Sequence, residues 1–73
     1  MPKGKHKTPE NRAREEIASV IDWAERQGYG DVPAIEALRH QPTQDTVLRA
    51  IQWADQQGFR NIAAALRERG FNL

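Results

Sequence analysis

The side chains that could act as a nucleophile, a base or a metal ligand are few and widely spaced in this chain of 73 residues. Ser19 is the only serine, and no histidine lies near it in the sequence, although nucleophilic catalysis needs a base beside the nucleophile. His6 and His40 are far apart, and there is no cysteine to supply a thiolate. We therefore expect a protein that is not an enzyme, with no catalytic residue, metal, cofactor or small-molecule substrate.

Carboxylates are more frequent, but their spacing indicates a solvated helix face. Glu15, Glu16, Asp22 and Glu25 fall within one helical stretch, and a general acid needs a pocket that shifts its pKa. Asp22 also lies four residues before Arg26, the spacing of an ion pair on a helix surface. We interpret these side chains as part of an exposed surface.

Positive charge is concentrated at the start of the chain. Residues 1–14 carry five basic side chains and one carboxylate, whereas residues 15–73 carry six arginines and nine carboxylates, for a net charge of +1. Because residues 1–8 are charged and poor in apolar surface, we expect a disordered basic tail that could contact nucleic acid without sequence specificity. The longest apolar run, 62–66, is far shorter than the roughly 20 residues that cross a bilayer, so we expect a soluble, cytoplasmic protein without membrane contact.

The remainder of the chain repeats itself with an offset of 30 residues. The segments 17–34 and 47–64 share the pattern I-x-W-A-(E/D)-x-Q-G-(Y/F)-x-(D/N)-(V/I). In both segments, apolar residues recur at i, i+3, i+4 and i+7, which is typical of one face of a helix. A glycine followed by an aromatic residue then closes the helix, and a second short helix follows. Each copy therefore predicts a helix hairpin.

We accordingly predict an all-α fold of four short helices, arranged as two pseudo-repeated hairpins around a pseudo-twofold axis. The single domain covers 9–73, with units at about 9–42 and 43–73. The expected helices are 9–27, 32–40, 44–57 and 62–69. Their expected N-caps are Thr8, Asp31, Thr43 and Asn61.

Glycine and apolar residues define the expected turns and core. Gly28 and Gly58 should adopt left-handed conformations, with Tyr29 and Phe59 folding back on the last turn, and Gly70 followed by Phe71 should repeat this arrangement. The expected core consists of parts of both tryptophans together with Ile17, Val20, Ile21, Val47, Ile51, Ile62 and Leu66.

Two classes of partner remain open for a binding protein of this kind. Ala24 with Gly28, and Ala54 with Gly58, have the spacing of a helix-turn-helix, and residues 61–71 resemble a helix of resolvase-type DNA-binding domains. The helix at 32–40, however, begins with apolar and acidic residues, and the acidic body would repel phosphate. We therefore favour a protein partner over direct reading of DNA or RNA.

Basic side chains are the candidate partner-binding residues, because arginine often anchors interfaces. They are Lys3, Lys5, Lys7, Arg12, Arg14, Arg39, Arg60, Arg67 and Arg69.

The chain as a whole resembles the small regulators that lytic phages direct against bacterial RNA polymerase. The resemblance lies in a very short, cysteine-free, helical chain rich in alanine and arginine that starts with MPKGKHK. It implies binding to the polymerase in the host cytoplasm, inhibition of promoter initiation and antitermination, that is, readthrough of terminators. An antitoxin-like or adaptor protein for another machine is a third hypothesis.

Overall fold

The computed structural model describes residues 9–73, which form helices and connecting turns without a strand in this range. Helix α1 spans Pro9–Arg26, α2 Pro33–His40, α3 Gln44–Gln57 and α4 Arg60–Ala65, and α4 continues as a π-helical segment, η1, at Leu66–Gly70. The predicted all-α class is confirmed, and the first three helices agree with their expected bounds to within one residue. The expected disorder of residues 1–8 and the expected cap at Thr8 lie outside the described residues.

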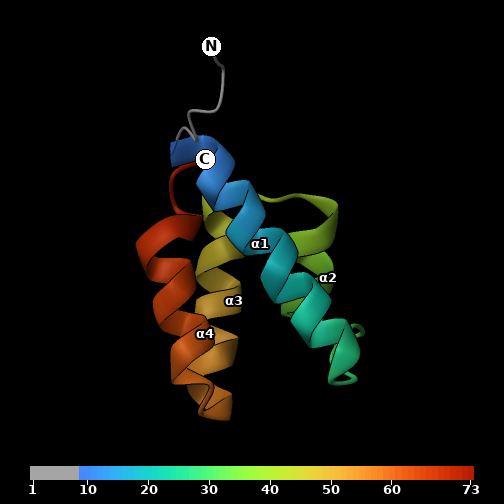
Figure 1. Ribbon diagram of the computed structural model, residues 1–73. Helices are drawn as coiled ribbons and strands as arrows, with labels where there is room; N and C mark the ends of the chain where they lie inside the picture. The colour runs from blue at the N-terminus through green and yellow to red at the C-terminus, as the bar shows by residue number, and fades with distance from the viewer. Residues whose placement is uncertain (1–8) are drawn as a thin grey trace.

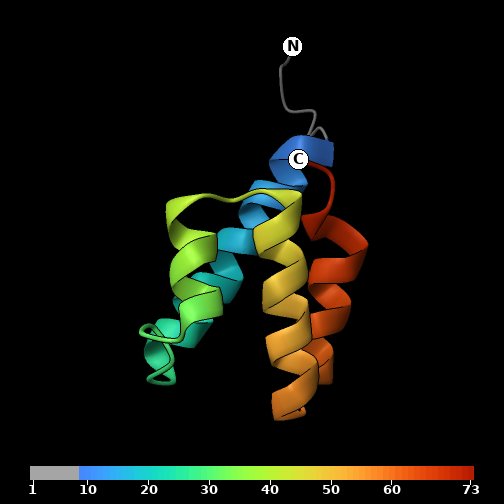
Figure 2. The same cartoon turned by 180° about the vertical axis from the view of Figure 1, so that it is seen from behind.

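The helices pair as two hairpins, α1 with α2 and α3 with α4 (Figure 1). Between the hairpins, α1 packs against η1 and α2 packs against α3, and Figure 2 shows α2 and α3 from behind. The first helix of each hairpin thus contacts the second helix of the other, as a twofold relation requires. Both glycine turns lie at one end of the molecule, opposite the start of α1 and the C-terminus (Figure 1).

The two glycine turns close α1 and α3 by the same hydrogen bonds. Gly28 and Gly58 have φ values of 89° and 85°, the left-handed region that glycine adopts without steric cost. The amide of Gly28 donates to Glu25, and that of Tyr29 donates to Ala24, at 3.2 and 2.7 Å. The equivalent bonds of Gly58 and Phe59 measure 3.2 and 2.8 Å. Both turns are therefore Schellman motifs, as the repeated glycine-aromatic pair predicts.

Of the predicted N-caps, the one at Thr43 is confirmed. Its hydroxyl accepts from the amide of Thr46, and the Thr46 hydroxyl accepts from the amide of Thr43 at 2.8 Å, a reciprocal capping box. The cap at Asp31 is wrong: Val32 precedes α2 without a side-chain bond, and Pro33 opens the helix with its fixed φ and no amide hydrogen to cap.

The predicted cap at Asn61 is also wrong. Helix α4 starts at Arg60, directly after Phe59, so Asn61 lies inside its first turn. The amide of Ala63 donates to the carbonyl of Phe59 at 3.1 Å. The first hydrogen bond of the helix is therefore accepted by Phe59, two residues before Asn61.

The core contains most, but not all, of the expected residues. Ile17, Val20, Val47, Ile51 and Leu66 are buried as predicted, and both tryptophans are half-buried. Ile21 and Ile62 are only half-buried, which corrects that part of the prediction. Ala24, Ala50 and Ala54, which belong to the predicted apolar helix faces, are also buried. Residues that the sequence did not place in the core complete it: Ala13, Ile35, Leu38 and Ala63.

Four aromatic rings pack between the two hairpins. Trp23 and Tyr29 come from the first hairpin, and Trp53 and Phe59 occupy the equivalent positions of the second. Each ring contacts the other three, with centroids between 5.0 and 6.4 Å apart. This aromatic cluster joins the ends of the hairpins that carry the glycine turns, and its tilted and edge-on geometry is the one that aromatic pairs favour.

The prediction of a third left-handed glycine, at Gly70, is wrong. Within residues 9–73, positive φ values occur at Gly28 and Gly58, whereas Gly70 ends η1 and is buried. A Cβ atom at Gly70 would lie 3.1 Å from Val47 Cγ1 and 3.3 Å from Leu66 Cδ2. A Cβ atom here would require the side chains of Val47 and Leu66 to move by a few tenths of an ångström.

Replacing Gly70 by alanine should therefore destabilise the fold by about 1–3 kcal/mol, the usual range for overpacking a core. The added methyl group would press on Val47, which is fully buried and has little room to move. Urea unfolding followed by circular dichroism measures the change. Gly30→Ala is the matched control, because its Cβ atom would meet the flexible side chains of Arg39 and Glu25 at 3.4 Å. Equal stability of the two variants would contradict the prediction.

Candidate interaction surface

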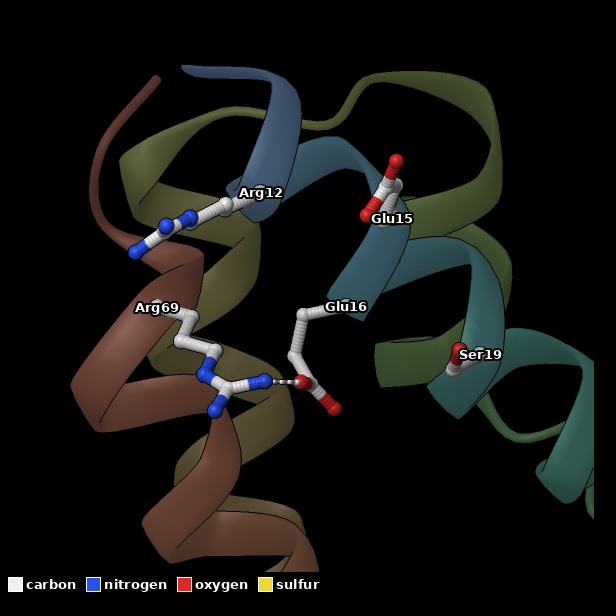
Figure 3. Close-up of a pocket in the computed structure, with 5 residues that line it drawn as sticks. All are labelled: Arg12, Glu15, Glu16, Ser19 and Arg69. Atoms are coloured by element: carbon white, nitrogen blue, oxygen red, sulfur yellow. Dashed lines mark ion pairs between the residues drawn. The ribbon is translucent and has the colours of Figure 1, made fainter. Parts of the chain in front are cut away.

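A charged hollow lies between α1 and η1 near the start of α1 (Figure 3). Arg12, Glu15, Glu16 and Ser19 follow the i, i+3, i+4 and i+7 spacing and therefore share one face of α1. Arg69 completes the lining from η1. The adjacent face of α1 carries Ala13, Ile17 and Val20, and burial of these residues against the core places the charged face beside η1.

The two arginines of the charged hollow come from opposite ends of the sequence. Arg69 Nη1 lies 3.5 Å from Glu16 Oε1, and Figure 3 shows these two side chains pointing towards each other. The Glu16 side chain is 18% exposed and that of Arg69 is 62% exposed. The Arg12 side chain points away from Glu16 in Figure 3 and forms no ion pair with any residue of 9–73. Its guanidinium is exposed and open to an external anion.

Two other candidate arginines each join the two helices of one hairpin. Arg39 Nη2 lies 2.8 Å from Glu25 Oε2 and donates to the carbonyl of Gly30 at 3.2 Å, which links α2 to the first glycine turn. Arg67 pairs with Asp55 and links η1 to α3. Glu25 and Asp55 are equivalent in the two repeats, so each hairpin has one ion pair between its helices.

The remaining described candidates lie outside the hollow. Arg14 pairs with Glu10 at 2.9 Å on the surface of α1, as Arg26 does with Asp22 at 3.0 Å, which confirms the ion pair that the spacing predicts. Arg60 starts α4 near the second glycine turn and has no ion pair within residues 9–73. Lys3, Lys5 and Lys7 lie outside the described residues.

Sequence reasoning identified the two arginines of the hollow but not its other members. Glu16 was interpreted as part of a solvated face and Ser19 was considered only as a nucleophile, whereas both line the hollow. Their spacing from Arg12 places them on one helix face and was a usable signal. Nothing in the local sequence, however, indicates that Arg69 packs beside that face, because 50 or more residues separate them.

In the part of the chain that the structure describes, no group of three histidine, cysteine, aspartate or glutamate residues could hold a metal ion. Across the same residues, no helix combines the length and apolar character needed to span a membrane.

No protein-family model, curated protein or solved structure matches the chain.

Proposed function

We propose that this chain is a non-enzymatic protein-binding regulator whose contact surface includes the charged hollow. One observation supports this most directly: Arg12 and Arg69, which lie far apart in the sequence, line the same hollow near the start of α1. Exposed arginines that share one hollow form a surface that attracts and orients an acidic partner.

The proposed partner is bacterial RNA polymerase, on the resemblance of the chain to small phage regulators of that enzyme. In this proposal the regulator inhibits promoter initiation, promotes readthrough of terminators, or does both. Binding through exposed charges mainly affects the association rate and its salt dependence. The ordered core of the regulator then serves to place Arg12 and Arg69 at the same hollow.

A small DNA- or RNA-binding regulator is the alternative function, and Arg60 is the observation that favours it. Arg60 and Asn61 occupy the first turn of α4, where a recognition helix presents its base-reading side chains. The rest of this helix face is less suitable, because Arg67 is held by Asp55. Helix α2 begins at Pro33 after an apolar residue and carries Glu36 in its first turn, which favours protein over phosphate as a partner.

Binding of the purified chain to purified bacterial RNA polymerase tests the proposed function. We expect a complex, and we expect reduced promoter initiation or increased terminator readthrough in a reconstituted transcription reaction. The double variant Arg12→Gln/Arg69→Gln should bind roughly 2- to 25-fold more weakly, since each exposed ion pair contributes about 0.2–1 kcal/mol.

The matched control is Arg49→Gln, which also removes an exposed arginine without an ion pair in residues 9–73 but lies on α3, outside the hollow. It should bind like the unchanged chain. Failure to bind polymerase, together with tight binding to duplex DNA that weakens steeply with salt, would replace the proposed function by the alternative one.

A further inference from the structure

We infer that the charged hollow binds an acidic protein segment. One carboxylate of this segment replaces Glu16 as the ion-pair partner of Arg69, and a second carboxylate pairs with Arg12. This inference rests on the proposed function and names the chemistry of the partner surface. In this inference, the Glu16 carboxylate competes with the partner's carboxylate for Arg69, and it pairs with Arg69 when no partner is bound.

The ion pair between Arg69 and Glu16 is well suited to exchange. Its length of 3.5 Å makes it the longest ion pair between residues of 9–73, compared with 2.8 Å for Arg39–Glu25. Charge-assisted hydrogen bonds between guanidinium and carboxylate usually measure about 2.7–2.9 Å, so this pair leaves the donors of Arg69 incompletely used. Because Arg69 is exposed, an external carboxylate can approach it without moving the helices.

Arg12 offers the second binding group. Glu16 lies one helical turn after Arg12, at the i+4 position, yet it points to Arg69 instead. Within residues 9–73, the Arg12 guanidinium therefore has no ion-pair partner, and its N–H donors can bind a ligand. A planar guanidinium matches a carboxylate with two parallel hydrogen bonds, which adds direction to the charge attraction.

The signs of the surrounding charges favour a carboxylate-bearing protein over a nucleic acid. Glu16 lines the same hollow as the two arginines, and Glu68 precedes Arg69 in η1. Duplex DNA carries one phosphate charge per roughly 1.7 Å of helix axis, so a phosphate backbone would also be placed against these carboxylates. A peptide can space its acidic residues to meet the arginines and present neutral or basic groups to the glutamates.

The test is a titration of the isotope-labelled full chain with a peptide of alternating glutamate and glycine, followed by NMR at low salt. The matched peptide of alternating glutamine and glycine is the uncharged control. We expect the glutamate peptide alone to shift the signals of Arg12, Arg69 and their neighbours. Arg12→Gln and Arg69→Gln should each weaken binding by about 1.5- to 5-fold, whereas Arg49→Gln should not.

Glu16→Gln provides the sharper measurement. Removal of the competing charge should tighten binding of the glutamate peptide by about 1.5- to 5-fold, with the helical spectrum unchanged. If Glu16 only stabilised the fold, Glu16→Gln would bind the glutamate peptide with unchanged or lower affinity. Either result would overturn the inference. So would equal losses in Arg12→Gln and Arg49→Gln, or tighter binding of a short duplex DNA at the same site.

The peptide titration contains no polymerase, so its result separates the two proposals. If the peptide behaves as expected but polymerase does not bind, the acidic-segment inference stands and the partner is a different protein. If polymerase binds but Glu16→Gln leaves the peptide affinity unchanged, the proposed function stands and the exchange at Arg69 is wrong.

Discussion

Replacement of Trp53 by alanine is expected to destabilise the fold by about 3 kcal/mol, the lower end of the range for removing a large aromatic side chain from a core. Trp53 is half-buried, which places it at that lower end, but it contacts Trp23, Tyr29 and Phe59 at once. A domain of this size has only about 3–5 kcal/mol available from its core, so most of the stability would be lost.

Urea unfolding followed by circular dichroism measures this effect, and Trp53→Phe should recover part of the loss because it keeps a ring in the aromatic cluster. Leu48→Ala is the control, since Leu48 is 45% exposed on α3 and its removal should change stability by no more than about 0.5 kcal/mol. Similar unfolding midpoints for Trp53→Ala and Leu48→Ala would show that the four rings do not hold the hairpins together.

Replacement of Leu38 by alanine should cost about 2–5 kcal/mol, because Leu38 is fully buried where α2 packs against the core. Ile21→Ala is the informative comparison. Ile21 belongs to the repeated pattern and was expected in the core, but it is only half-buried. We therefore expect Ile21→Ala to cost less than Leu38→Ala, although both remove a branched aliphatic side chain.

Thermal and urea unfolding of the two variants, measured side by side, give the order of their stabilities. The reverse order, with Ile21→Ala the less stable, would contradict the prediction. It would mean that Ile21, at a repeated apolar position, contributes more to stability than the buried Leu38 of α2. Ile35→Ala should behave like Leu38→Ala, because Ile35 is also fully buried on the same helix.

Local backbone chemistry made much of this fold predictable. A glycine followed by an aromatic residue after an amphipathic stretch specified the Schellman turns at Gly28 and Gly58, because glycine alone reaches positive φ cheaply. Thr43 specified the start of α3 in the same way, through a hydroxyl that reaches the amide of the third helical residue. These signals act within a few residues, so the sequence contains them in full.

Local signals failed where a distant segment decided the outcome. Gly70 has the same glycine-aromatic signature as the two turns, yet the approach of Val47 from α3 makes it a buried glycine in a π-helical segment. Ile35 and Leu38 lie on a helix too short for a clear pattern, and only its packing against α3 shows that they are buried.

Some features of the charged hollow could likewise be predicted from the sequence, and others depend on the tertiary structure. The sequence by itself determined which residues carry charge, which of them share a face of α1, and that positive charge gathers near the start of the chain. Only the tertiary structure decided that Arg69 lies beside Glu16 and that Arg39 and Arg67 are engaged with Glu25 and Asp55. The physical reason is that helix spacing is set within one turn, whereas the meeting of two helices depends on the burial of all their apolar faces together.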